Sequence, residues 1–122
     1  MKETMCENLR IQTMRLRTDP FLQIKCGKKR VELRLADEKR SKLRIGDFII
    51  FEHTENAEET LRARVTDLRR YENFDQVQKD FCLEALGFSA GEESLGERMR
   101  IYYPDSDVQK YGVLAICIER ES

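Results

Sequence analysis

The sequence has 122 residues, enough for a single domain that buries about two thirds of the surface exposed by its unfolded chain. Apolar residues make up 40% of it, but no apolar run approaches the roughly 20 residues of a transmembrane helix. Residues 1–10 lack the apolar core of a signal peptide. We therefore expect one cytoplasmic domain over 1–122, no contact with a membrane, and a frayed N-terminal extension over 1–10.

The net charge of −1 conceals an asymmetry between the two parts of the chain. Residues 1–50 contain 13 Lys and Arg against 7 Asp and Glu, a balance of +6, and residues 51–122 contain 9 against 16, a balance of −7. Eight of the basic residues lie in 28–44, beside three acidic ones. If the fold keeps these charges together, a polyanion would approach the N-terminal half.

The cysteines and the single histidine do not form a recognisable metal site. Cys6, Cys26, Cys82 and Cys117 are widely separated and include no CxxC pair. Reduced, mostly buried thiols are therefore expected, with no zinc site, no disulfide framework and no cofactor. Cys117 lies inside an apolar run and is interpreted as a core residue. His53 could serve as a base, but a lone histidine without a nearby nucleophile is more typical of a structural role.

The first two predicted elements are a strand and a short helix. Residues 11–17 alternate between apolar and polar side chains, with arginines on one face, which predicts a strand. A helix is then predicted over 19–27. Asp19 would be its N-cap, Pro20 its first residue and Gly27 the left-handed residue after its last turn.

A second strand is predicted to begin at Arg30, where the pattern changes to period two. Its apolar and charged faces would consist of Val31, Leu33 and Leu35 and of Arg30, Glu32 and Arg34, respectively. Glu32 then stands between two guanidinium groups, with Lys29 at the strand entrance. Alternation alone favours an ordinary strand with a solvated, salt-bridged face.

The middle of the chain predicts two further strands. A charge-dense connection over 37–44 leads to a turn at 46–47, and 48–51 is apolar on both faces, which predicts a strand buried on both sides. Residues 54–59 are polar and acidic and predict a hairpin loop. The next segment, 60–66, alternates cleanly, and Leu68 breaks its parity, which predicts a bulge or bend near Asp67.

Two helices are predicted next. Asn73 with Gln76, and Ser89 with Glu92, resemble capping boxes, and the second helix would end at Pro104. Their apolar stripes would be Phe74, Val77 and Phe81, and Leu95, Met99 and Tyr102.

The last segment of the chain predicts a polar connection over 105–110 and a strand over 113–119. Its six consecutive apolar residues indicate burial on both faces. Strands outnumber helices, so we predict an α+β fold with a mostly antiparallel sheet. On this basis alone, a barrel and an open sheet both remain possible.

Residues around the second strand resemble a known signature. Gly27, Lys29, Glu32 and Arg34 match Gly-x-Lys-x-x-Glu-x-Arg, the signature of the ASCH domain, a branch of the PUA-like β-barrels associated with RNA. Four further segments resemble one bacterial and archaeal ASCH subgroup, so that the resemblance covers roughly 11–119; they are Met14–Arg17, Asp37–Arg40, Ile45–Asp47 and Lys110–Val113. The resemblance implies a small, mostly antiparallel PUA-like β-barrel flanked by helices.

The first functional hypothesis is binding of RNA or a nucleotide in a basic cleft at the barrel mouth. Glu32 and Arg34 would project into the cleft, with Lys29 at its rim. The predicted ligand-binding residues are Arg17, Lys29, Glu32, Arg34, Lys39, Arg40 and Tyr111. Arginine suits phosphate or a base edge, and Glu32 could accept from an exocyclic amine. The four tyrosines could offer a stacking surface or be half-buried core residues.

The second hypothesis is hydrolysis of a modified nucleoside or RNA, in which Lys29 and Glu32 would be the catalytic residues. A bacterial acetylcytidine amidohydrolase belongs to the same ASCH group and uses the motif Lys with a Thr nucleophile. Lys29 matches that Lys, but Glu32 stands in place of the Thr, so that mechanism does not carry over intact. A third hypothesis is a regulatory module that binds a protein partner.

Overall fold

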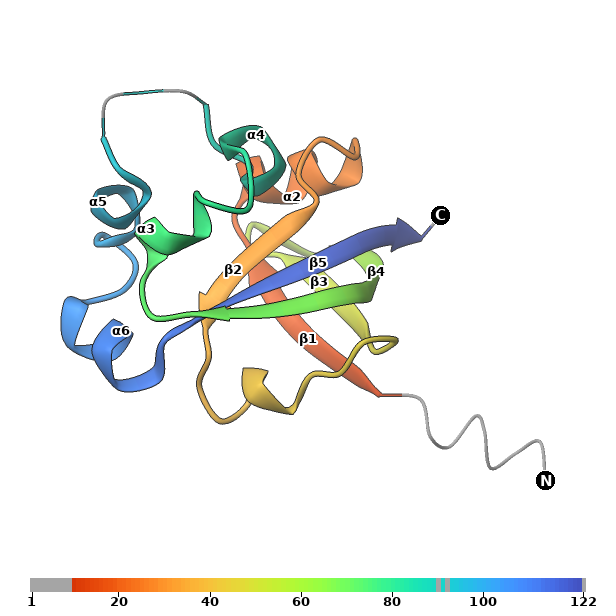
Figure 1. Ribbon diagram of the computed structural model, residues 1–122. Coiled ribbons are helices and arrows are strands. Elements are labelled where there is room, and N and C mark those ends of the chain that lie inside the picture. Colours follow the sequence, from red (N-terminus) through yellow and green to blue (C-terminus); the bar gives the residue numbers. More distant parts are fainter. Residues whose placement is uncertain (1–9, 90, 92, 122) are drawn as a thin grey trace.

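The computed structural model describes residues 10–89, 91 and 93–121; apart from Arg10, the predicted extension over 1–10 lies outside the described residues. Five strands form one sheet, in the order β1-β3-β4-β5-β2, which curls into a half-barrel (Figure 1). The strands are β1 (Ile11–Leu16), β2 (Val31–Leu35), β3 (Phe48–His53), β4 (Asn56–Tyr71) and β5 (Val113–Glu121). β1 and β3 run parallel, and the other three neighbouring pairs run antiparallel. This confirms the predicted α+β fold.

Helices flank the sheet at two places. One helix joins β1 to β2, and a 3₁₀ turn lies between β2 and β3. The described part of the connection from β4 to β5 contains four short helices, which pack along the side of the sheet that carries β2 (Figure 1). These elements are α2 (Thr18–Lys25), η1 (Arg40–Lys42), α3 (Phe74–Val77), α4 (Leu83–Leu86), α5 (Leu95–Met99) and α6 (Asp105–Tyr111).

The prediction of two helices between β4 and β5 was wrong. Asn73 does cap α3 by accepting a hydrogen bond from the Gln76 amide, but that helix is only one turn long. Ser94, rather than Ser89, caps α5. Pro104 precedes α6 instead of ending a helix, so the expected polar connection over 105–110 is helical. Helices this short bury too few residues to leave a periodic pattern in the sequence.

The core consists of two apolar clusters on opposite faces of the sheet. β5 contributes to both, because Leu114 and Ile116 belong to one cluster while Val113 and Ala115 belong to the other. This confirms the predicted burial of β5 on two faces. β3 is different. Ile49 and Phe51 are fully buried, but Phe48 and Ile50 are only half-buried. The predicted burial of β3 on both sides was therefore wrong for one face.

The start of α2 differs from the prediction in one detail. Arg17 occupies the N-cap and Asp19 lies in the first turn. Pro20 is tolerated there because the first N–H groups of a helix have no intrahelical acceptor in any case. Gly27 has the predicted left-handed conformation, with φ of 85°. The bulge near Asp67 is also confirmed, since the pairing of β4 with β5 shifts between Val65 and Asp67.

Two other local predictions were wrong. The hairpin loop is shorter than 54–59, because β4 already begins at Asn56 and pairs with β3. Of the three cysteines in the described residues, Cys26 and Cys82 are exposed at helix ends, and Cys117 is half-buried beside the core. Burial raises the pKa of the Cys117 thiol. In the part of the chain that the structure describes, no helix has the length and apolarity needed to cross a membrane.

Candidate ligand-binding cleft

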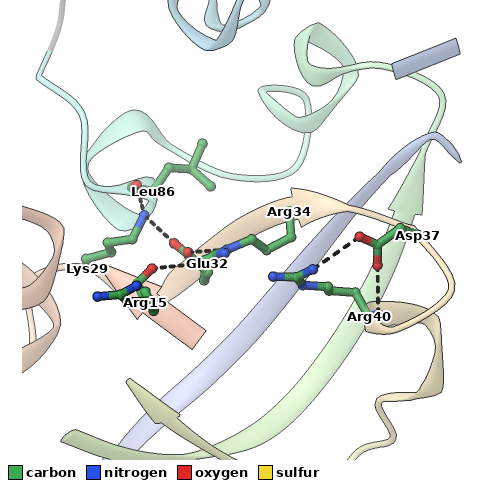
Figure 2. Close-up of polar contacts among 7 residues, drawn as sticks. All are labelled: Arg15, Lys29, Glu32, Arg34, Asp37, Arg40 and Leu86. Carbon is green, nitrogen blue, oxygen red and sulfur yellow. Dashed lines mark hydrogen bonds and ion pairs between the residues drawn. The ribbon is translucent and has the colours of Figure 1, made fainter. Parts of the chain in front are cut away.

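A buried chain of three charged side chains lies where α2 gives way to β2 (Figure 2). Glu32 and Arg34 have the same parity on β2, so both project from the face opposite Val31 and Leu33. The Glu32 carboxylate lies 3.3 Å from Lys29 Nζ and 2.8 Å from Arg34 Nε. Only 6% of Glu32 is exposed. The three residues therefore form one ion-paired unit below the surface.

Lys29 is anchored from two directions and is 7% exposed, so the prediction that it lies at the rim was wrong. Its ammonium donates to the Leu86 carbonyl at 2.6 Å, and its backbone N–H donates to the Gln23 carbonyl at 3.0 Å. Gly87, which ends α4, covers its side chain. A Cβ at Gly87 would lie 2.9 Å from Lys29 Cδ and 2.7 Å from Gln23 Oε1. The left-handed φ of 90° there also favours glycine.

Arg34 links the two edges of the sheet. Its Nη2 donates to the Arg15 carbonyl on β1 at 2.9 Å, while its Nε binds Glu32 (Figure 2). β1 and β2 are the first and last strands of the sheet order and are not paired with each other. A planar guanidinium can make both contacts at once because its donors point in fixed, divergent directions.

The electrostatic environment favours the charged forms of Glu32 and Arg34. Burial alone would raise the pKa of the Glu32 carboxyl, but Lys29 and then Arg34 outweigh it and hold the pKa below its ordinary value. Burial likewise opposes the charge on Arg34, but the Glu32 carboxylate raises the pKa of the guanidinium overall. Nearby, burial raises the pKa of the Tyr103 hydroxyl. Glu32 is therefore a carboxylate at neutral pH.

A cleft of about 850 Å³ opens over this unit. Its walls come from the end of β1, from α2, from α4 with the loop after it, and from the segment around α5. Six cationic side chains line it against three carboxylates; the cations are Arg15, Arg17, Lys28, Lys29, Arg34 and Arg98, and the carboxylates are Asp19, Glu32 and Glu84. Because Lys29, Glu32 and Arg34 largely satisfy one another, the accessible charge of the cleft comes from the surrounding groups.

Aromatic rings lie among these cations. The Arg17 guanidinium is 5.6 Å from the centre of the Tyr102 ring, and Arg98 is 5.9 Å from that of Phe88. Tyr102 is exposed, and Phe88 is half-buried. Arg98 also donates to the Ser89 carbonyl at 2.7 Å, which ties Ser89 to α5. The cleft therefore combines cations with ring faces, a composition typical of sites for nucleic-acid bases and phosphates.

The structure brings together four of the seven residues predicted to bind a ligand, namely Arg17, Lys29, Glu32 and Arg34. The other three lie outside the cleft. Arg40 pairs with Asp37 at 3.1 Å beyond the end of β2 (Figure 2). The carbonyl of the adjacent Lys39 accepts a hydrogen bond from Gln12. Tyr111 lines a separate cleft. Residues 28–44 therefore do not form one surface, because β2 carries the chain away from the motif.

Sequence reasoning missed Arg98, Phe88 and Glu84. They follow β4 in the chain, where no local pattern distinguished them from surface residues. His53 lies outside the cleft. It binds Thr18 and Glu59 and stacks on Phe21, contacts that suit the structural role expected of it. Among the described residues, no group of three His, Cys, Asp or Glu side chains is arranged to hold a metal ion.

Comparison with known proteins identifies the family. The model of the ASCH domain matches residues 14–122. The chain is 33% identical to the hypothetical protein PH0355, whose crystal structure matches with a TM-score of 0.77 over 91% of this chain and 99% of that one. It is also 33% identical to PF0455 from Pyrococcus furiosus, solved by NMR, with a TM-score of 0.64 over 90% of this chain and 96% of the other.

A serine-to-alanine mutant of ZmASCH from Zymomonas mobilis shares the fold at 14% identity. Its crystal structure matches with a TM-score of 0.62 over 88% of this chain and 67% of that one. No curated protein matches the sequence. The family model spans nearly the whole described fold, including the buried Lys29–Glu32–Arg34 unit, and the chain belongs to the ASCH domain family.

Proposed function

We propose that the cleft binds single-stranded RNA or a nucleotide. The ASCH domain is a PUA-like fold generally linked to RNA binding. The observation that carries the proposal is the open cleft itself, with exposed cations and an exposed tyrosine above a buried floor in which Lys29 and Arg34 pair with Glu32. In this arrangement Arg17 and Lys28 contact phosphates, and Tyr102 stacks against a base.

The contacts of Glu32 support binding more than hydrolysis. A general base works best when its pKa lies near the operating pH. The pKa of Glu32 is lowered instead, because Lys29 and Arg34 outweigh the effect of burial. The ammonium of Lys29 is in turn directed at Glu32 and at the Leu86 carbonyl. The contacts of Lys29 and Glu32, the two candidate catalytic residues, therefore stabilise the floor of the cleft.

Binding of a labelled, short single-stranded RNA, measured by fluorescence anisotropy at several salt concentrations, tests the proposal. Arg17→Ala and Lys28→Ala should each weaken binding and reduce the slope of log affinity against log salt by about 0.7 per lost phosphate contact. Arg120→Ala is the matched control, because it removes the same charge from an exposed position on β5 outside the cleft. Affinity that did not change between low and physiological salt would contradict phosphate contacts.

Incubation with acetylated cytidine tests the hydrolase alternative. We expect no release of acetate, since Glu32 replaces the Thr of the related amidohydrolase. Release that is lost in both Lys29→Ala and Glu32→Gln, with both variants still folded by circular dichroism, would mean that the carboxylate acts in catalysis. The proposal of binding alone would then be wrong.

A further inference from the structure

A second cleft, of about 650 Å³, lies on the other side of the segment that contains α5. Its walls come from the end of β4, from α3, from the segment around α5, and from α6, which gather at one end of the sheet (Figure 1). Tyr111, predicted from the sequence to bind a ligand, lies here and is 39% exposed. The proposed function gives this cleft no role.

The two clefts share a wall. Tyr103 lines both of them, and its neighbours divide between the two sides. Arg98 and Tyr102 face the first cleft, whereas Gly96 and Arg100 face the second. The Tyr103 ring is stacked on that of Phe74, with centroids 5.7 Å apart, so the wall is braced from the second side. A chain molecule leaving the first cleft past Tyr103 would enter the second.

The polarity of the second cleft differs from that of the first. Two cations, Arg100 and Lys110, line it against three carboxylates, and Arg100 already pairs with Asp105 at 3.3 Å. This balance does not favour phosphate. The cleft instead offers tyrosine rings together with the exposed amides of Asn73 and Gln109. Amides and carboxylates are the groups that read base edges, and tyrosine rings are the usual stacking platforms.

We propose that the second cleft holds the base of a neighbouring nucleotide, so that the ligand is single-stranded nucleic acid of at least two nucleotides. One phosphate lies among the cations of the first cleft, the strand passes over Tyr103, and the next base stacks on Tyr111. Lys110, whose ammonium is 5.1 Å from the centre of the Tyr111 ring, places a cation beside that base. This inference rests on the proposed function and extends it to a second subsite.

Titration calorimetry with a mononucleotide, the corresponding dinucleotide and a hexanucleotide tests the inference. The dinucleotide should bind about tenfold more tightly than the mononucleotide, the scale of one additional stacked base. Tyr111→Ala should remove most of that gain, and Tyr111→Phe, which keeps the ring, should retain it. Ile101→Ala is the control, because Ile101 is 80% exposed and lines neither cleft, and it should change neither affinity.

The outcomes separate this inference from the proposed function. If the mononucleotide binds and the dinucleotide binds no more tightly, the second subsite is wrong and the proposed function stands. A gain that survives in Tyr111→Ala would also overturn the subsite. If none of the three ligands binds, the proposed function fails and this inference fails with it.

Discussion

Glu32 is a carboxylate with 6% of its surface exposed, held between an ammonium and a guanidinium. Taking three charges out of water is costly, and the cost is offset only if each charge keeps its partners. The Leu86 carbonyl accepts a hydrogen bond from Lys29, and the Arg15 carbonyl accepts one from Arg34. Glu32 is the one anion of the unit, so its loss leaves two buried cations without a counter-charge.

Replacing Glu32 with Gln should destabilise the fold by about 3–5 kcal/mol at pH 7, the range for breaking a buried ion pair. The folded-state pKa of Glu32 lies below its ordinary value of 4.5. Its stabilisation is thus complete above pH 4.5 and is lost as the pH falls through the folded pKa. Urea unfolding at several pH values should show the gap between wild type and variant narrowing below pH 4.5. Glu119→Gln, at an exposed site on β5, should show no such gap.

Gly87→Ala should also destabilise the fold, for two separable reasons. The left-handed backbone costs an L-residue about 1–2 kcal/mol, and the added methyl would meet Lys29 and Gln23. Gly46 is the matched control, since its φ of 98° is similar but a Cβ there meets nothing within 4 Å. Urea unfolding should therefore show a larger loss for Gly87→Ala than for Gly46→Ala. Equal losses would mean that Lys29 moves aside freely.

At the scale of elements, α2 connects the cleft to the rest of the sheet. Arg17, Asp19 and Gln23 line the cleft. Another face of the helix, formed by Thr18, Phe21 and Lys25, contacts the hairpin of β3 and β4. His53 shares a hydrogen bond of 2.7 Å with Thr18 and stacks on Phe21, and Lys25 pairs with Glu59. The position of the cleft wall therefore depends on contacts on the far side of the helix.

A double-mutant cycle measures this attachment. Thr18→Val and His53→Phe should each destabilise the fold, and the double variant should recover a coupling energy of about 1 kcal/mol, the scale of one hydrogen bond. His53→Phe keeps the ring that stacks on Phe21 but also loses the contact with Glu59, so the coupling energy, rather than either single loss, measures the contact with Thr18. Additive losses in urea unfolding would show that the two side chains do not stabilise each other.

The elements differ in how well the sequence predicts them. β1, β2 and β5 follow from alternation or from an uninterrupted apolar run, because a strand leaves a pattern over a few residues. The short helices between β4 and β5 do not follow from such a pattern. The amides of Leu95 and Gly96 at the start of α5 are capped by Gln78 and Asp75 from near α3, and such contacts have no local signal. The cleft is also only partly predictable from the sequence. Strand parity predicts that Glu32 and Arg34 lie on the same face, but no sequence pattern predicts that the Leu86 carbonyl lies beside Lys29.

At the scale of the whole molecule, the sheet curls so that β1 and β2, its two edges, approach each other without pairing. Alternation in the sequence left a barrel and an open sheet equally possible, and only the resemblance to the ASCH domain favoured the barrel. Arg34 supplies a link across this gap, from β2 to the Arg15 carbonyl. The motif thus contributes to the closure of the fold as well as to the floor of the cleft.

Arg34→Lys tests this closure, because it keeps the positive charge and removes the planar guanidinium with its divergent donors. A single ammonium can satisfy Glu32 or reach the Arg15 carbonyl, but the two divergent contacts need a guanidinium. We expect a loss of about 1–2 kcal/mol from the missing hydrogen bond, concentrated at the edges of the sheet. Hydrogen exchange should accelerate most for amides of β1 and β2, through local opening of the sheet edges. In the β4–β5 ladder, whose amides exchange through global unfolding, it should accelerate by no more than the loss of global stability. Acceleration of equal size over all five strands would mean that the loss is global and that Arg34 has no particular role in holding the two edges together.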